Sequence, residues 1–422
     1  MLAKAGKAKA TANPRAERGK QIAQAGGIKH VGGARYLVPS QSGGAAYEVD
    51  LADGRCQCPD WQFHRSACKH IEATYLTIAW SASVDADGTV TETLTVTKVK
   101  RPTYPRNWPA YNAASVEQKR HARVLLRELC DTIDEPPHAG AGPKPFPLRD
   151  LIYGMVTKVY VGTDGRSAQT DIEDNRDRGF VRRAGCYNVY FKYMQFPSVT
   201  AILTRLIEQS AAPLAIIERA GQVAIDSTGF STVGYVRYFD HKHGKMKSRH
   251  PFTKLHAMVG CLTNVVTAVE VSDAGDCTAL PALLAQTRKN FRVLEVSADK
   301  AYASKDNIAL IYACGAEPFV AMKDNAVMDP KSPEWSRALA KSLLFREEWL
   351  ARYGRRQHVE ATFGAIKANF GGALRSRSSQ AKVNEVLIKV LCHNLWCVTR
   401  AVHEHGLEPS FSAGDAIAAV QS

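Results

Sequence analysis

The sequence predicts an α/β protein, in which a mixed sheet with helices on both faces follows a helical region and a small cysteine-containing module. Two apolar runs, QVAIDSTGFS from residue 222 and RVLEVSADKAY from residue 292, have the length and composition of buried strands. They alternate with amphipathic stretches, which is the order expected of a sheet layered with helices. Between them, KLHAMVGCLTNVVTAVEVS has the pattern of a hairpin turning near Thr263 and Asn264, so the sheet should be mixed.

Composition limits the classes of function. The chain has 422 residues, enough for two or three domains, and its net charge is +14 with a pI near 9.3. This charge indicates a polyanionic partner, most simply nucleic acid, although an anionic membrane surface would also suit it. No apolar run approaches the roughly 20 residues of a membrane span, and the Lys/Ala-rich N-terminus lacks the apolar segment of a signal peptide. We therefore expect a cytoplasmic protein without membrane contact.

Four potential metal ligands occur as two pairs with the same spacing. Cys56 and Cys58 are separated by one residue, and so are Cys68 and His70. Three thiolates and one imidazole complete a tetrahedral zinc site without an open position, which indicates one structural ion. His64 is a spare candidate that breaks the paired spacing.

The pattern C-x-C…C-x-H, with strands before it and Trp61 between the pairs, resembles the SWIM zinc finger over residues 45–75. The resemblance implies a module that binds nucleic acid or protein.

Two carboxylates should lie where α/β sheets place their sites. Asp226, with a Ser-Thr-Gly turn expected after it, and Asp299 are predicted on or at the carboxyl ends of the two buried strands. A buried carboxylate without a partner costs several kcal/mol, and a divalent metal ion supplies that partner. Hard carboxylate oxygens suit Mg²⁺ or Mn²⁺.

The stretch YGRRQHVEATFGAIK adds a third acid. It places Tyr353, Arg356, Glu360 and Lys367 within one broad face of a single expected helix. Taken alone, this pattern suits a solvated helix with i,i+4 ion pairs as well as it suits a surface that binds a phosphodiester. With two strand acids present, Glu360 becomes the third ligand for a pair of metal ions. One ion would activate the attacking water or 3′-hydroxyl and the other would stabilise the leaving oxygen.

Residues 221–400 resemble the catalytic domain of the DDE transposases of bacterial insertion sequences, which have a ribonuclease-H-like fold. Tyr353, Arg356, Glu360 and Lys367 match the Y-(2)-R-(3)-E-(6)-K signature of one large group of them, and the segment Asp299–Tyr302 resembles that group's second-acid motif. The resemblance implies metal-dependent cleavage and strand transfer at the terminal inverted repeats of a transposon, by a dimer in the complex with double-stranded DNA.

Roles for the side chains follow from this resemblance and from their chemistry. Asp226, Asp299 and Glu360 would hold two Mg²⁺ or Mn²⁺ ions, and Arg356 and Lys367 would bind phosphate. Tyr353 would position DNA by stacking or hydrogen bonding, and Tyr302 would support the turn at Asp299. Other residues keep two interpretations: Lys254 and His256 contact DNA or pack, and Asp240, Asp273 and Asp276 are alternative acids that turn and cap chemistry also explains.

The predicted organisation has five regions. They are a basic flexible arm (1–35), the zinc-finger module (36–100), a mostly helical DNA-binding region (101–220), the ribonuclease-H-like domain (221–404) and a C-terminal tail (405–422). Two alternatives to a transposase stay open: a metal-dependent nuclease on the same fold, and a non-catalytic DNA-binding protein derived from a transposase. The expected location is the bacterial cytoplasm, at the nucleoid when the protein is bound to DNA.

Overall fold

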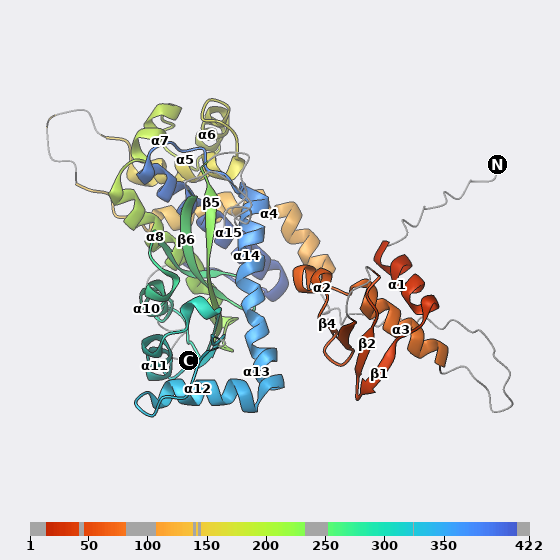
Figure 1. Cartoon of the computed structure of the whole chain (residues 1–422). Coiled ribbons are helices and arrows are strands. Elements are labelled where there is room, and N and C mark those ends of the chain that lie inside the picture. The colour runs from red at the N-terminus through yellow and green to blue at the C-terminus, as the bar shows by residue number, and fades with distance from the viewer. Residues whose placement is uncertain are drawn as a thin grey trace, which may run out of the picture. The chain divides into compact units, whose positions relative to one another are not determined.

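The computed structural model describes residues 14–41, 46–81, 107–137, 141, 145–232, 252–323 and 325–411. Contacts group the chain into two compact units, Met1–Pro105 and Arg106–Ser422, and Figure 1 labels their elements. Asp240 and the end of the C-terminal tail lie outside the described residues.

The first unit is an antiparallel sheet with helices. Its strands lie in the order β1 (Lys29–Gly32), β2 (Arg35–Val38), β3 (Tyr47–Asp50) and β4 (Arg55–Cys56). Its helices are α1 (Pro14–Ala25), α2 (Pro59–His64) and α3 (Lys69–Ser81). Val38, Val49 and Ile71 are fully buried between sheet and helices, together with the cysteines of the predicted metal site. The expected strands before the cysteine pairs are therefore confirmed.

The prediction of a flexible arm is wrong for residues 14–35. Residues 14–25 form α1, which packs against α3, and Ile22 and Ala23 belong to the core of the unit. A Cβ on Gly19 would lie 2.8 Å from Glu72, so the two helices touch closely at that point. The sequence did not predict this helix because it is largely polar and basic, and only two of its apolar side chains are buried in the core.

The second unit contains a mixed five-stranded sheet. The strand order is β7 (Val266–Val271), β6 (Phe252–Gly260), β5 (Gln222–Ser231), β8 (Glu295–Ala298) and β9 (Glu317–Val320). The first three strands are antiparallel, and β5, β8 and β9 are parallel. Asn264, with φ of 59°, forms the predicted turn between β6 and β7. The mixed sheet and its hairpin are as expected.

Helices before the sheet are α4 (Trp108–Asp131), α5 (Leu148–Val161), α6 (Ala168–Asp177), α7 (Tyr187–Tyr193), α8 (Pro197–Ala211) and η1 (Ala212–Ile216). Helices within or after the sheet are α10 (Asp276–Thr287), η2 (Lys300–Tyr302), α11 (Lys305–Ala313), α12 (Pro333–Leu344), α13 (Arg346–Tyr353), η3 (Gly354–Arg356), α14 (Gln357–Phe370) and α15 (Ser379–His405).

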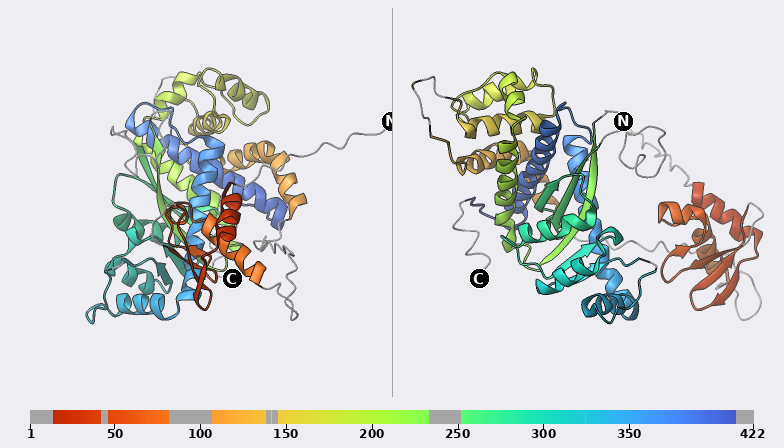
Figure 2. Two further views of the ribbon diagram at one scale, coloured as in Figure 1. Left: turned by 45° about the vertical axis from the view of Figure 1, so that its right-hand side comes forward. Right: turned by 60° about the vertical axis from the view of Figure 1, so that its left-hand side comes forward.

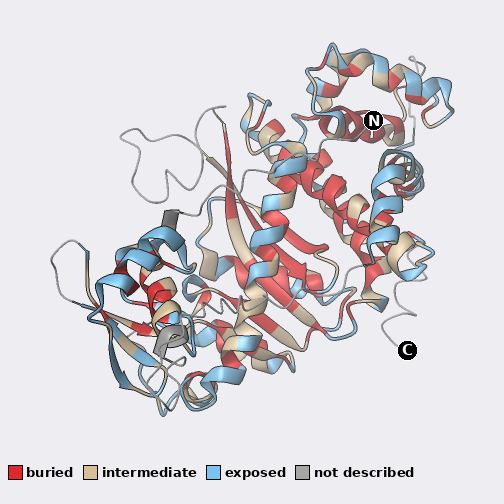
Figure 3. Ribbon diagram, turned by 90° about the vertical axis from the view of Figure 1, so that its right-hand side faces the viewer, coloured by how far each residue is buried: buried red, intermediate tan, exposed pale blue. Residues whose placement is uncertain are grey.

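Successive side chains of β5 point to opposite faces of the sheet, and so the core has two layers. Val223 and Ile225 pack with α10 and α11 on one face, whereas Ala224 and Phe230 pack with α14 and α15 on the other. Buried residues follow β5 and α15 along much of their length (Figure 3). Helices α4, α5 and α8 pack on α15, as the two views of Figure 2 show, so the helical region shares a core with the sheet.

Two details differ from the sequence analysis. Strand β5 does not turn after Asp226 but continues to Ser231, because Gly229 to Ser231 pair with β6 and this pairing outweighs the turn propensity of Ser-Thr-Gly. The expected single helix from Tyr353 is interrupted: Tyr353 ends α13, η3 follows, and Glu360 and Lys367 lie on α14. The two strand acids and Glu360 nevertheless come from the predicted elements.

Candidate active site and zinc site

The register of two parallel strands places Asp226 beside Asp299. The last paired residues of β5 and β8 are Ile225 and Ala298, so each acid is the next residue of its strand. Asp226 Oδ1 accepts a hydrogen bond from the backbone N–H of Ser227 at 2.8 Å, and Asp299 Oδ1 accepts one from Ala301 at 2.8 Å. Both carboxylates are therefore held by local backbone.

Arg356 joins the third acid to the first. Its Nη1 lies 2.6 Å from Glu360 Oε1 and 3.4 Å from Asp226 Oδ2. Burial would lower the pKa of Arg356, but Glu360, Tyr353 and Asp226 raise it, so the guanidinium stays charged. Two carboxylates from different elements thus converge on one cationic nitrogen.

This convergence bears on whether the acids could bind a divalent metal ion. Asp226 and Glu360 direct oxygen atoms at the same positive charge, and carboxylate oxygens are the hard ligands that Mg²⁺ takes. The oxygen atoms of the three acids are not close enough together to form a compact ligand set. Within the described parts of the chain, only the group of Cys56, Cys58, Cys68 and His70 brings three or more potential metal-ligand atoms within 4.8 Å of one another. Asp226 and Glu360 therefore offer carboxylate oxygens of the kind that suits a divalent ion, and in this structure both are directed at Arg356.

Lys367 lies on the same face of β5 as Asp226. Its Nζ donates to Thr228 Oγ1 at 2.6 Å and lies 5.4 Å from the centre of the Phe230 ring. Burial lowers the pKa of Lys367 to about 8. The ammonium is thus fixed beside Thr228, two residues along the strand from Asp226.

Tyr353 is half-buried and packs against side chains of its own helix and of the following turn. Its ring stacks on Trp349, with centroids 4.8 Å apart and planes inclined by 14°. The guanidinium of Arg356 lies over the Tyr353 ring at 5.9 Å. Glu295 at the start of β8 pairs with Arg352 and Arg355 on the adjoining turns. These contacts tie the end of α13 and the turn η3 to the start of β8.

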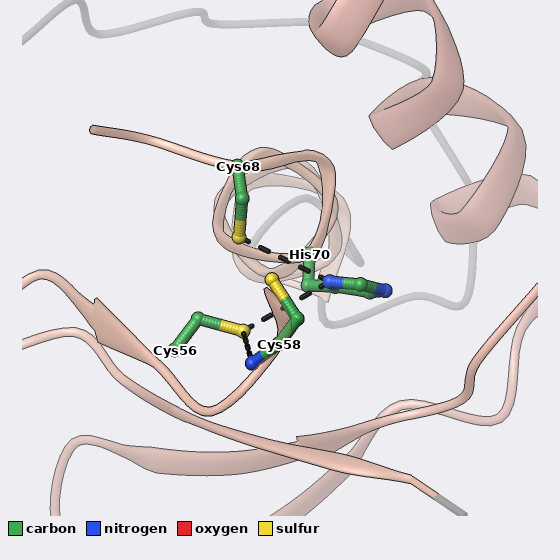
Figure 4. A group of neighbouring side chains, drawn as sticks. All are labelled: Cys56, Cys58, Cys68 and His70. Atoms are coloured by element: carbon green, nitrogen blue, oxygen red, sulfur yellow. Dashed lines mark hydrogen bonds between the residues drawn. The ribbon is translucent and has the colours of Figure 1, made fainter. Parts of the chain in front are cut away.

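The four predicted zinc ligands meet in the first unit. Their ligand atoms lie within 4.8 Å of one another and all four residues are buried (Figure 4). The Sγ atoms of Cys56 and Cys68 each lie 3.9 Å from His70 Nδ1, close to the edges of about 3.5–3.8 Å that a tetrahedral Zn²⁺ site requires. His64 is exposed and pairs with Asp60 at 3.7 Å, outside this cluster.

Backbone groups orient the zinc-site thiols. Cys58 Sγ accepts a hydrogen bond from the N–H of Trp61, and Cys56 Sγ accepts one from the N–H of Cys58, both at 3.4 Å. Burial raises the pKa of the Cys58 thiol, so a metal ion must displace its proton. The cluster fits one structural zinc ion.

Asp276 does not have the capping role that its position before α10 suggests. The N-cap of α10 is Gly275, and no side chain makes a capping hydrogen bond to this helix. Asp276 Oδ1 instead lies 2.9 Å from Lys254 Nζ and 3.4 Å from Nδ1 of the fully buried His256. In the sequence, the spacing Lys254-x-His256 on a predicted strand indicates that these two side chains share one face of the sheet. A carboxylate near that face, such as Asp276, could therefore have been expected to pair with them.

A mixed sheet with acids on neighbouring parallel strands, facing an acid on a packed helix, is the arrangement expected of metal-dependent phosphoryl-transfer enzymes. Comparison with protein families is more specific. Residues 219–395 match the transposase DDE domain, and residues 47–79 match the SWIM zinc finger. Residues 219–395 are therefore a DDE transposase domain, which belongs to the polynucleotidyl transferases, and a SWIM zinc finger precedes it. A search of curated proteins finds no match to the chain.

Among the described helices, none combines the length and apolar character needed to cross a membrane.

Proposed function

We propose that this protein is a DNA transposase that binds the terminal inverted repeats of its element and catalyses strand cleavage and strand transfer with two divalent ions. The observation that carries the proposal is the convergence of Asp226 and Glu360 on one cationic nitrogen, inside a DDE domain. Asp299, next to Asp226 in the parallel register, completes the ligand set. The remaining Y-(2)-R-(3)-E-(6)-K residues support assignment to the insertion-sequence group with that signature.

The proposed chemistry divides between metal and protein. The ions would activate the water or 3′-hydroxyl and stabilise the leaving oxygen. Arg356 would exchange its carboxylate partners for a DNA phosphate, because its planar fork binds both kinds of oxygen. Lys367, held by Thr228, would bind a second phosphate oxygen as a point charge. Tyr353 would act through Arg356, by supporting its guanidinium.

The rest of the chain would supply DNA affinity. The net charge of +14 favours a polyanionic partner, and the helical region before the sheet is the proposed binder of the repeats. Two ends must be brought together for strand transfer, so the DNA complex would be a dimer. The zinc finger would add a contact to DNA or to a protein.

A strand-transfer assay tests the function. Purified protein with Mg²⁺ should join a labelled 3′ end of the element to target DNA. Cleavage without joining would favour a nuclease on the same fold. DNA binding without either reaction would favour a non-catalytic derivative and contradict the proposal.

Replacing Arg356 by Gln should have opposite effects on metal and DNA. Without DNA, Mn²⁺ should bind about tenfold or more tightly, because two unit charges about 4 Å apart near a protein surface interact by up to about 4 kcal/mol. Joining should fall because the phosphate contact is lost. Electron paramagnetic resonance of free Mn²⁺ measures the affinity.

Lys367→Gln is the matched control for this prediction. The substitution removes one positive charge from the same face of β5. In the wild type, however, the Lys367 ammonium donates to Thr228 and not to a carboxylate. Its effect on Mn²⁺ affinity should be much smaller. Equal effects of the two substitutions would contradict a specific place for Arg356 between the acids.

A further inference from the structure

The loop that follows the third-acid helix is joined to the end of β5. This loop, residues 371–378, connects α14, which packs on β5, to α15 (Figure 1). Ser231, the last residue of β5, donates its N–H to the carbonyl oxygen of Gly372 at 3.0 Å and accepts a hydrogen bond from the N–H of Leu374 at 2.7 Å. Ser231 and Ala373 also form a parallel bridge. The loop is therefore held at the end of the strand that carries Asp226.

A buried ion pair on α15 binds the first half of the loop. The side chains of Glu385 and Lys389 are each 3% exposed, and their charged atoms lie 3.6 Å apart. Lys389 Nζ donates to the carbonyl oxygens of Gly371 and Ala373, both at 2.8 Å. The ammonium is thus directed at the backbone of the loop.

Glu385 binds the second half of the loop. Its carboxylate accepts hydrogen bonds from the backbone N–H of Arg375 at 3.1 Å and of Ser376 at 2.8 Å. Burial acts to raise the pKa of Glu385, but Lys389 and these N–H groups lower it, so the carboxylate stays charged. A buried ion pair is costly unless further hydrogen bonds satisfy both groups. Here those bonds go to the loop backbone, and they fix its conformation.

The fixed backbone presents two arginines to solvent. Arg375 and Arg377 are exposed, whereas the neighbouring Leu374 is buried. Within the part of the chain that the structure describes, neither guanidinium has a hydrogen bond or an ion pair to another residue. Two positive charges are thus held at defined backbone positions without an anion beside them.

The sequence around the loop is strongly basic. Residues 349–384 contain one acid, Glu360, and seven basic residues: Arg352, Arg355, Arg356, Lys367, Arg375, Arg377 and Lys382. The first three of these arginines pair with acids, so the excess positive charge lies at Lys367 and beyond. This charge favours a polyanionic partner.

The loop is continuous with the candidate active site through Lys367. A Cβ on Gly372 would lie 3.7 Å from Lys367 Cγ, so the loop packs against the stem of this side chain. Ser231, to which the loop is joined, is five residues beyond Asp226, about 17 Å along an extended strand. A DNA strand rises about 3.4 Å per nucleotide, so this length corresponds to about five nucleotides. A polyanion that reaches Lys367 would therefore also reach the loop.

We infer that residues 371–378 form a further phosphate-binding site for DNA, in which Arg375 and Arg377 contact the backbone about five nucleotides from the reacting phosphate. Guanidinium groups bind phosphate oxygens through two parallel hydrogen bonds. Contacts to the backbone fix register and carry no sequence information, so this site sets how the DNA lies across the three acids. The inference rests on the proposed function, which supplies the DNA at Lys367.

A double variant, Arg375→Gln with Arg377→Gln, tests the inference in the full-length protein. Its affinity for a duplex that carries the end of the element should fall about tenfold or more. The slope of log affinity against log salt concentration should shrink by about 1.8, because each lost phosphate contact changes it by about 0.9. The rate constant for joining at saturating DNA should stay within about threefold of the wild type, since uniform binding affects affinity only.

Neutralising single phosphates locates the contact. A methylphosphonate placed at each phosphate in turn should weaken wild-type binding most strongly about five nucleotides from the cleaved phosphate. The same replacement should have little effect on the double variant, because groups in contact are coupled in a double-mutant cycle. The matched control combines Arg219→Gln with Arg292→Gln, two exposed arginines that precede β5 and β8. It should keep the wild-type pattern.

Wild-type affinity and salt dependence in the double variant would overturn the inference and favour an acidic protein as the partner of the loop. An equal loss of affinity in the control variant would also overturn it, because net charge alone would then explain the effect. Both results leave the proposed function standing as long as the wild type joins DNA. A wild-type protein that does not bind the duplex would instead overturn the proposed function, and the inference with it.

Discussion

Replacing Asp299 by Asn is expected to abolish strand cleavage and joining while leaving DNA binding largely intact. Asp299 follows the last paired residue of β8 and lies beside Asp226. The amide has the same shape but not the charge that draws a divalent ion. Losing about 4 kcal/mol of transition-state stabilisation lowers the rate about 10³-fold, since each 1.36 kcal/mol is tenfold. Single-turnover joining of a labelled 3′ end measures the loss, and electrophoretic mobility shift measures binding.

The matched control is Asp306→Asn. Asp306 is an exposed acid at the start of α11, seven residues further on, so it carries the same charge without facing the site. This variant should join DNA at the wild-type rate. Joining that persists in Asp299→Asn would remove Asp299 from the metal site.

Replacing Cys68 by Ser should unfold the zinc-finger unit without removing the catalytic activity of the second unit. The thiolate and imidazole ligands lie within 4.8 Å of one another and are buried in the core of the small unit. In domains of this size the binding free energy of zinc, about 10–16 kcal/mol in zinc-finger peptides, is largely folding free energy. Elemental analysis should find the zinc lost, and hydrogen exchange should show residues 46–81 unprotected.

Cys186→Ser is the control for the zinc-site variant. Cys186 is an exposed free cysteine of the second unit, so its replacement should leave zinc content and protection unchanged. Zinc at one equivalent in Cys68→Ser would contradict the four-ligand site. Loss of cleavage by the DDE domain together with zinc would mean that the two units do not function separately.

The features predicted well from sequence are those fixed by local spacing. The two ligand pairs of the zinc site repeat one spacing, and their meeting in space is confirmed. The hairpin and the parallel strands follow from period and from strand-forming residues, so the mixed sheet was predictable. The same patterns predict that Asp226 and Asp299 lie at strands and that Glu360 lies on a helix, as the structure has them. Their role as metal ligands stays a prediction.

What the sequence did not indicate depends on contacts between distant segments. The continuation of β5 beyond Asp226 depends on pairing with β6, and the folding of α1 depends on docking to α3. The pairing of Arg356 with both Asp226 and Glu360 also depends on the fold, because Asp226 comes within 3.4 Å of it from another element. The ion-pair partner of Asp276, Lys254, likewise lies on a different element.

The alternation of β5 makes the site sensitive to any change in chain length. Asp226 and Ser227 lie on opposite faces of one strand, the first toward Arg356 and the second on the face where Val223 and Ile225 pack with α10. Deleting one residue between Gln222 and Ile225 would interchange these faces if the outer pairing were kept, and it would turn the acid away from Glu360. Insertions in surface loops carry no such restriction. Selection on this strand should therefore tolerate substitutions at apolar positions far more readily than the gain or loss of a single codon.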